Sequence, residues 1–473
     1  MLFNSFEYLI FLPIVFMLYW FVFRALKWQN AFVVLASYLF YGWWNWRFLL
    51  LIFITTFASY LSGVLIGRYQ SRAKIVCVAN IVLNLGILCI YKYYNFFASQ
   101  LATLLGVEAD AFMLHLVLPV GISFYTFQAL SYSIDVSKGK IAPTNNFWAF
   151  AAFISFFPQL VAGPIERATN LLPQFLQHRT FSYAQATDGM RQILWGLFKK
   201  MVVADTCAET ANYVFAEFHN QHIGSLFLVV GAVAFAFQIY GDFSGYSDIA
   251  IGTAKLFGIR LKQNFSVPYF SRSVAEFWRR WHISLNTWFV DYVYIPLGGS
   301  RCGRIKMIRN TFVIFLLSGL WHGANWTFVA WGAYHAMLFV PFVLMRTNRK
   351  YLDVVAPDSL LPTAKEVGQM ALTFVLVVIG WIFFRAENIA DAFCFLYQMV
   401  TRVNVFYPLG NHIYGILWAL LMLMVEWSAR KREHALSYVP IPSKHLRLII
   451  YVAIFVIIIA CRGQQQEFIY FQF

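Results

Sequence analysis

Long apolar runs separated by short polar segments recur from one end of the chain to the other. Clear examples cover residues 8–23, 75–91, 370–384 and 446–461. Each run is close to the roughly 20 apolar residues that a transmembrane helix needs. Counting such runs along the sequence predicts an all-α polytopic membrane protein with about 12 transmembrane helices.

Two stretches interrupt this pattern. Residues 241–300 mix Gly, Pro, Asp, Arg and aromatic residues without a clean apolar run, and HGAN divides the apolar stretch 310–340. Non-helical backbone at membrane depth is tolerated only where it is buried in protein or lines a cavity. We therefore expect re-entrant or intramembrane segments around a central cavity. Gly323 and Asn325 should end one helix and begin the next, which places His322 at their junction.

The composition and charge agree with a membrane protein. Hydrophobic residues make up 60% of the 473 residues and charged residues 12%, against roughly 45–50% and 25% in soluble domains. The net charge of +15 could indicate nucleic-acid binding. However, the basic residues cluster in short loops between apolar runs, as the positive-inside rule describes for cytoplasmic loops, so we favour membrane topology as the cause.

The charge pattern also orients the two ends of the chain. The first run lacks the basic segment and cleavage site of a signal peptide, so we interpret it as a retained span. The segment 427–447 is strongly basic and should be cytoplasmic. The span 446–461 then carries the chain outward, and Tyr470 should lie at the outer face or fold back into the protein from it.

Two of the ten histidines are embedded among aromatic residues beside a polar break. They are His322 in SGLWHGANW and His282 in EFWRRWHISL. Ionisable residues inside membrane segments are costly and are functional candidates by default. For His115 and His335, a ring satisfied by a backbone carbonyl is the simpler interpretation, and the remaining six lie in or beside polar loops.

The chemistry that these histidines could perform is limited by the motifs present. The sequence has no GxSxG elbow, HExxH motif, Walker loop or carboxylate-rich metal cluster, and its six scattered cysteines indicate neither a metal site nor a disulfide framework. A buried histidine can remove a proton from a hydroxyl as it attacks an activated acyl group. Acyl transfer from a thioester is therefore the favoured reaction, without a metal.

Six motifs then carry a family resemblance. The chain resembles the membrane-bound O-acyltransferase (MBOAT) family, in the bacterial branch of alginate and peptidoglycan O-acetyltransferase membrane subunits, with the teichoic-acid D-alanyltransferases more distant. The motifs are LPVGISFYTFQALSYSIDV (118–136), FFPQLVAGPIER (156–167), YGDFSGYSDIAIGTAKLFGI (240–259), NFSVPYFSRSVAEFWRRWHISL (264–285), YIPLGGSR (294–301) and SGLWHGANWTFVAWGAYHA (318–336). The core signature region is about 117–340 within one integral-membrane domain, 1–473.

The resemblance implies roles for particular residues. His322 corresponds to the base of the family's WHG motif, and His282 is the second histidine of a tunnel through the membrane core. Trp281, Trp321, Asn325 and Asp242 fall near these histidines by motif. Arg272, Arg279 and Arg280 could bind the phosphates of coenzyme A, because guanidinium groups bind phosphate bidentately. An equal alternative is that the three arginines only contribute the positive charge that is typical of cytoplasmic loops.

The sequence ends in FIYFQF (468–473). In the teichoic-acid system, a small companion membrane peptide ends in a similar motif whose tyrosine is proposed to receive the acyl group. The resemblance thus implies an acyl relay through Tyr470 in the final segment, 446–473. The alternative is a tyrosine of an interfacial aromatic belt.

The expected function is that of an O-acetyltransferase in the bacterial cytoplasmic membrane. It would use acetyl-CoA as a substrate, with no permanently bound cofactor, and serve an extracytoplasmic polysaccharide through a periplasmic or surface-anchored partner. Alginate, peptidoglycan and other exopolysaccharides stay open as acceptors. A transporter or flippase of a lipid-linked sugar or acyl donor is the alternative, but it should show symmetric repeats, and none is found. A scaffold subunit of a secretion complex is a weaker third interpretation.

Overall fold

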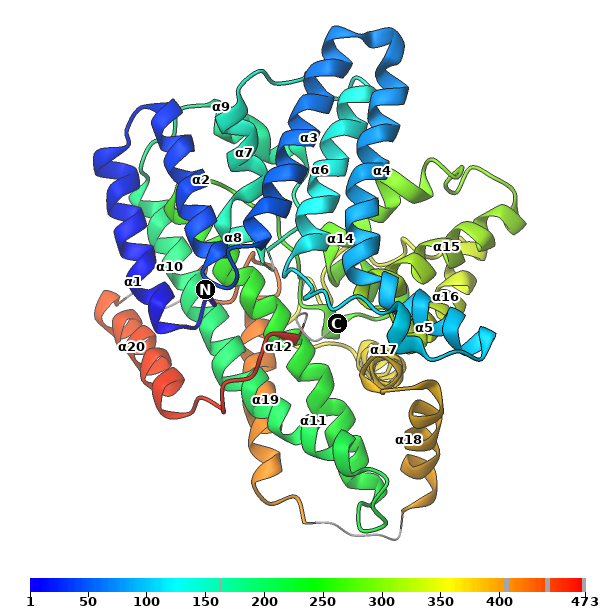
Figure 1. Ribbon diagram of the computed structural model, residues 1–473. Coiled ribbons are helices and arrows are strands. Elements are labelled where there is room, and N and C mark those ends of the chain that lie inside the picture. The colour runs from blue at the N-terminus through cyan, green and yellow to red at the C-terminus, as the bar shows by residue number, and fades with distance from the viewer. Residues whose placement is uncertain (162, 404–407, 439–442, 470–473) are drawn as a thin grey trace. The chain divides into compact units, whose positions relative to one another are not determined.

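The computed structural model describes residues 1–161, 163–403, 408–438 and 443–469, and these residues form helices and connecting segments without a β-strand (Figure 1). They divide into two compact units. Unit 1 contains residues 1–190 and 250–262, and unit 2 contains residues 191–249 and 263–473. The boundaries between the units fall within the helices α10 and α12.

Unit 1 is built from the first nine helices. Their bounds are α1 Phe6–Met17, α2 Leu26–Gly42, α3 Phe48–Arg68, α4 Ala73–Lys92, α5 Tyr94–Leu105, α6 Ile122–Ser137, α7 Phe147–Ser155, α8 Phe157–Leu160 and α9 Ala168–Leu176. Helix α6 is almost completely buried and packs against α3 and α4. A network of small polar side chains joins these three helices: Ser133 Oγ lies 2.6 Å from Ser62 Oγ and accepts a 2.8 Å hydrogen bond from Asn80. Such interhelical hydrogen bonds are typical of membrane helices.

Unit 2 contains the later helices and the candidate site. Their bounds are α10 Tyr183–Leu197, α11 Asp205–Glu217, α12 Ser225–Leu256, α13 Val274–Arg280, α14 Ile283–Phe289, α15 Arg304–His322, α16 Trp326–Leu344, α17 Ala364–Arg385, α18 Ile389–Thr401, α19 Tyr414–Ser428 and α20 Lys444–Ala460. Two π-helical segments, Phe198–Ala204 and Val290–Tyr294, continue α10 and α14.

The chain is a multi-pass membrane protein by the character of its helices. Within the described ranges, five helical segments are long and apolar enough to cross a bilayer: Phe48–Arg68, Gln70–Lys92, Ser225–Leu256, Trp326–Leu344 and Ala364–Arg385. The predicted count of about twelve therefore stays a prediction, as does the central tunnel. The predicted last span, 446–461, coincides with α20 within two residues.

The expectation for residues 241–300 was wrong in its first part. Residues up to Leu256 continue the 32-residue helix α12, although they include Asp242, Ser244 and Ser247. These polar side chains are buried, so they face protein instead of lipid and the helix needs no uniformly apolar surface. The remainder, 257–300, forms the short segments that were expected.

Candidate active site

Glycine residues bring α15 and α16 into close contact. A Cβ atom on Gly319 would lie 2.2 Å from the carbonyl oxygen of Phe328, and one on Gly332 would lie 2.3 Å from that of Phe315. Small residues allow this approach of two membrane helices. The resulting antiparallel pair (Figure 1) fixes the turn between the helices, which is the HGAN segment.

His322 is the last residue of α15, as the HGAN break predicted. Asn325 begins α16 as its N-cap, accepting a 3.0 Å hydrogen bond from the backbone N–H of Thr327 through Oδ1. The imidazole of His322 is buried, and its centroid lies 4.9 Å from that of Trp321, 5.2 Å from Trp331 and 5.2 Å from Phe384. These rings shield the imidazole from most contact with solvent.

His282 occupies the junction between α13 and α14 with a left-handed backbone, at φ 43° and ψ 53°. A non-glycine residue in this region is strained and is often functional. Its Nδ1 lies 3.1 Å from Asn264 Oδ1, and that oxygen also accepts hydrogen bonds from the backbone N–H and the hydroxyl of Ser284. Because this oxygen is an acceptor, Nδ1 of His282 carries the proton and Nε2 is the basic nitrogen.

Aromatic rings connect the two histidines. The Trp321 indole lies 5.6 Å from the His282 ring and 4.9 Å from the His322 ring, measured between centroids. A second series of aromatic contacts connects Trp281 with His322. Trp281 packs against Trp381 at a centroid distance of 4.9 Å, Trp381 stacks on Trp331, and Trp331 contacts His322. The structure thus brings His282, His322, Trp281 and Trp321 together, as the motifs predicted. It places them in one buried aromatic cluster.

Asn264 is a site residue that the sequence analysis did not single out. Its Nδ2 donates to Ser247 Oγ, so the amide orientation follows from its neighbours. We predict that Asn264→Asp shifts the acid limb of the pH–rate profile to higher pH, because a carboxylate favours the protonated imidazole of His282. Rates at high pH should fall less than rates at low pH, since the carboxylate still accepts a hydrogen bond from Nδ1 of His282. An unchanged profile would show that His282 does not titrate in the reaction.

Asp242, which falls near the histidines by motif, precedes Phe243, whose ring lies 4.6 Å from that of His282. Asp242 contacts the C-terminal segment: its Oδ2 accepts a 2.7 Å hydrogen bond from the backbone N–H of Ile469, and its Oδ1 lies 2.8 Å from Lys200 Nζ. Lys200 also pairs with Asp205 at 2.8 Å and donates to the carbonyl oxygen of Gln466 at 3.2 Å. These three buried charged residues, called the Lys200 cluster below, therefore bind the segment that contains Gln466 and Ile469.

Further contacts hold residues 463–469, called the tail below. Backbone N–H groups of Gly463 and Gln464 donate to Met201 and Glu209, and Asn212 donates to the Gln466 side chain. Phe468 is fully buried against Tyr246, at a centroid distance of 4.2 Å, and against Phe243 at 6.1 Å. Phe243 in turn lies 4.6 Å from His282. A single aromatic ring, that of Phe243, therefore separates Phe468 of the tail from His282. Tyr470 lies outside the described residues.

Arg272, Arg279 and Arg280 all bind other residues of the protein. Arg272 forms a bidentate pair with Glu276 at 3.0–3.1 Å and lies over the ring of Tyr351, while Arg280 binds the same carboxylate at 2.9 Å. Arg279 donates to the carbonyl oxygens of Asn348 and Tyr351. Although burial opposes its charge, the hydrogen bonds and charge of Glu276 raise the pKa of Arg272.

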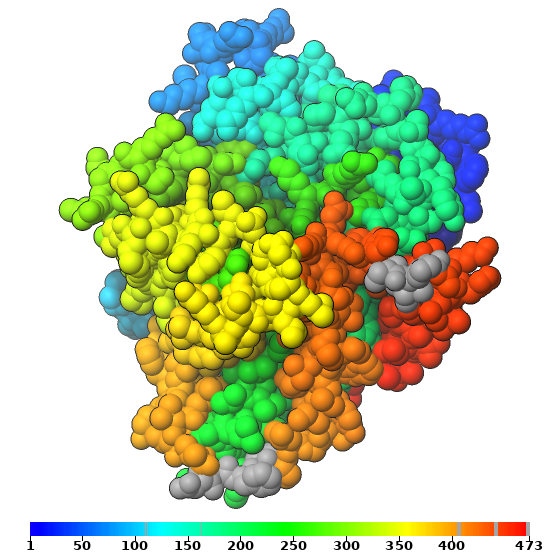
Figure 2. Space-filling model, turned by 180° about the vertical axis from the view of Figure 1, so that it is seen from behind, coloured from blue at the N-terminus to red at the C-terminus, as the bar shows by residue number. Residues whose placement is uncertain are grey.

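These contacts fasten the loop after α16 to α13. That part of the chain lies in yellow on the surface turned to the viewer in Figure 2. Binding of coenzyme A phosphates by these arginines stays a prediction, and a phosphate would have to share guanidinium N–H groups with the loop.

His335 was expected to form a hydrogen bond with a backbone carbonyl group, and this expectation was wrong for the described residues. His335 is fully buried, and among the described residues neither ring nitrogen has a hydrogen-bond partner. Its ring instead packs at 4.9 Å from Trp278 and 5.1 Å from Trp331. The described residues contain no cluster of three or more His, Cys, Asp or Glu side chains with the geometry of a metal site.

The arrangement combines a buried imidazole, a second imidazole of defined tautomer and a tail whose Phe468 is one aromatic ring away from His282. Such a site can accept a proton from a hydroxyl and transfer an acyl group without water.

Comparison with known proteins agrees with this chemistry. The sequence profile described as "MBOAT, membrane-bound O-acyltransferase family" matches residues 81–353. The chain is 42% identical over 399 residues to the probable alginate O-acetylase AlgI of Pseudomonas aeruginosa, covering 83% of this chain and 73% of that protein. It is 32% identical over 422 residues to the peptidoglycan O-acetyltransferase of Helicobacter pylori, covering 82% and 78%. The teichoic acid D-alanyltransferase of Bacillus subtilis is 27% identical over 286 residues, covering 57% and 69%. The chain therefore belongs to the membrane-bound O-acyltransferase family and is an acyltransferase, as its motifs predicted.

Proposed function

We propose that this protein transfers acetyl groups from acetyl-CoA on the cytoplasmic side of the bacterial inner membrane to an extracytoplasmic polysaccharide, with Tyr470 as an intermediate carrier. The relatives named for O-acetylation of alginate and peptidoglycan support a polysaccharide acceptor. The observation that carries the relay is the tail: Ile469 is bound to Asp242, and Phe468 lies one ring away from His282.

The proposed first step forms an ester on the tail. His322 removes the phenolic proton of Tyr470 as the oxygen attacks the thioester carbonyl carbon of acetyl-CoA. The C–S bond then breaks, and the leaving thiolate takes the proton from the imidazolium. The products are O-acetyl-Tyr470 and coenzyme A. A phenol of pKa about 10 is a poor nucleophile at neutral pH unless a base activates it. In this step, Nε2 of His282 would accept a hydrogen bond from a donor group at the site and so orient that group.

The proposed second step releases the carrier. A hydroxyl group of the acceptor, or of a periplasmic or surface-anchored partner, attacks the ester carbonyl of O-acetyl-Tyr470. The ester C–O bond to tyrosine breaks, and the acceptor's proton restores the phenol. A phenolate is a better leaving group than an alkoxide, so the acetyl-tyrosine ester is more reactive than the sugar ester that it forms.

The test is mass spectrometry of the C-terminal peptide after purified protein has been incubated with acetyl-CoA. We expect an acetyl group on Tyr470 in the wild type and none in Tyr470→Phe, which keeps the aromatic ring and should leave folding unchanged. Tyr451→Phe, in α20, is the matched control and should retain the label. Polysaccharide acetylation in a turning-over system without any acetyl on Tyr470 would disprove the relay.

A further inference from the structure

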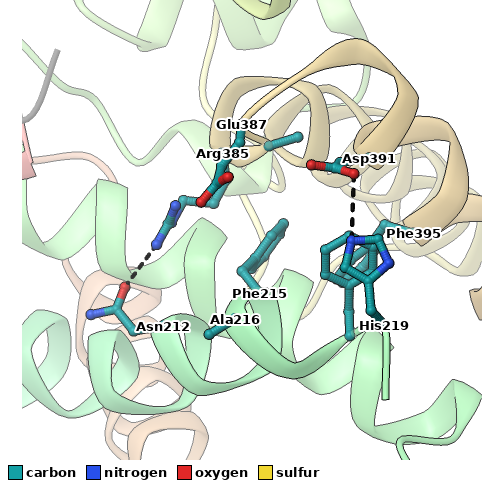
Figure 3. Close-up of a pocket in the computed structure, with 10 residues that line it drawn as sticks. Asn212, Phe215, Ala216, His219, Arg385, Glu387, Asp391 and Phe395 are labelled. Carbon is teal, nitrogen blue, oxygen red and sulfur yellow. Dashed lines mark hydrogen bonds and ion pairs between the residues drawn. The ribbon is translucent and has the colours of Figure 1, made fainter. Parts of the chain in front are cut away.

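A cavity of about 160 Å³ lies beside the tail and has no role in the chemistry above. It is formed by α11 and by the end of α17 with the start of α18 (Figure 3). Its polar lining residues are Asn212, His219, Arg385, Glu387 and Asp391. The phenylalanines Phe215, Phe218 and Phe395 form its apolar lining.

The cavity shares residues with both parts of the candidate site. Asn212 donates to the Gln466 side chain of the tail at 3.3 Å. On the other wall, the backbone oxygen of Glu387 accepts a 2.9 Å hydrogen bond from Asn325, the residue that caps α16 next to His322. A molecule bound in the cavity is therefore held next to Gln466 of the tail.

The orientation of α17 places this cavity on the outer side. The loop before α17 carries Arg346, Arg349 and Lys350, and a basic loop is cytoplasmic by the positive-inside rule. Helix α17 has 22 residues, which span about 33 Å at 1.5 Å per residue and so cross the bilayer. Its last residue, Arg385, and the cavity then lie where an extracytoplasmic acceptor approaches.

The lining combines phenylalanine side chains with a polar rim, and the Arg385 guanidinium lies over the Phe215 ring at 5.6 Å from its centroid. Phe215 and Phe395 stack at a centroid distance of 4.6 Å and an angle of 12°. In Figure 3, His219 and Asp391 lie beside Phe395, and Arg385 and Glu387 lie on the other side of Phe215. A pyranose ring likewise combines apolar C–H groups with hydroxyl groups that both donate and accept hydrogen bonds. The volume is below the roughly 300–1,000 Å³ of sites for larger ligands, so it suits one ring.

The charges in the lining favour an uncharged ring over a uronate. Arg385 already donates to Asn212 Oδ1 at 3.1 Å, and Asp391 lies 3.5 Å from His219. A sugar carboxylate would meet one guanidinium and two carboxylates, Glu387 and Asp391, and like charges a few ångströms apart repel. Sugar hydroxyls, in contrast, can donate to both carboxylates.

We propose that this cavity binds one uncharged pyranose ring of the acceptor polysaccharide and holds it next to the tail. The inference rests on the proposed function, since it assigns the acceptor side of the same reaction. It gives this chain a part in selecting the acceptor.

The test measures binding to full-length protein in nanodiscs by saturation-transfer NMR, with a β-1,4-linked glucose oligosaccharide and a mannuronate oligosaccharide of equal length. We expect the glucose oligomer to bind more tightly than the mannuronate oligomer. Asp391→Ala should weaken binding of the glucose oligomer by about tenfold, as loss of a hydrogen bond to a charged group implies, and the exposed His219→Ala should also weaken it. Tyr397→Phe, exposed on the same helix α18, should have no effect.

Two results would overturn the proposal: no binding of either oligosaccharide, which would favour a loop of a partner protein as the occupant, or equal or tighter binding of the mannuronate oligomer. Acetylation of Tyr470 is measured in the same preparations, without any acceptor. If Tyr470 becomes acetylated while no sugar binds, only the cavity inference fails. If Tyr470 stays unmodified, the proposed function fails whatever binds in the cavity.

Discussion

Replacing His322 with alanine should lower the rate of coenzyme A release from acetyl-CoA by about 10²–10⁴-fold, the usual contribution of a general base. The buried imidazole sits among Trp321, Trp331 and Phe384, where water cannot easily take over as the proton acceptor. The rate is followed by thiol detection on purified protein in nanodiscs. Acetylation of Tyr470, read by mass spectrometry, should fall in parallel.

His445→Ala is the matched control, because this histidine is exposed at the start of α20 and should leave the rate unchanged. Thermal unfolding of His322→Ala shows whether the variant is folded. A folded His322→Ala protein that retains more than about a tenth of the wild-type rate would contradict the assignment, since it lies outside the range expected for a general base.

Replacing Lys200 with methionine should release the tail. Lys200 Nζ lies 2.8 Å from both Asp205 and Asp242, and all three side chains are buried. Removing one partner from a buried ion pair costs about 3–5 kcal/mol, because the remaining charge has no compensation. We expect the free energy of unfolding to fall by about that amount, the tail to become sensitive to carboxypeptidase, and acetylation of Tyr470 to be lost.

Lys199→Met separates the tail effect from lost stability. Lys199 is equally buried in the same π-helical segment, but its ion pairs are with Asp248 at 2.6 Å and Glu426 at 3.8 Å. This variant should also be less stable while keeping its tail protected from carboxypeptidase. Equal protease sensitivity of the two variants would mean that the Lys200 cluster has no specific part in binding the tail.

Local signals in the sequence predicted the part of the site that depends on neighbouring residues. The HGAN break located the junction after His322, because glycine and an N-capping asparagine end and begin helices through short-range geometry. The aromatic residues around His282 and His322 likewise indicated burial. The family motifs added the pairing of these two histidines, whose residue numbers lie 40 apart, and the structure connects them through Trp321.

The parts that depend on distant contacts were not predictable in this way. Lys200 and Asp205 lie five residues apart, but Asp242 and the tail come from other parts of the chain, and only the folded structure shows that they meet Lys200. One signal was available, since two adjacent lysines in LFKKMVVAD interrupt an apolar run and such charges are costly unless paired. Helix α12 was misread beyond Gly241 because polar residues that face protein are indistinguishable, in sequence, from residues that end a span.

The bound tail has a kinetic consequence for the proposed carrier. Because it belongs to the same polypeptide, the acyl-accepting tyrosine does not have to be captured from solution, and intramolecular partners can have effective concentrations far above those of free molecules. A synthetic FIYFQF peptide should therefore be a weak competitor even at millimolar concentration. Without an acceptor, coenzyme A release should stop after a burst of about one equivalent per protein molecule, since each chain carries a single loading position.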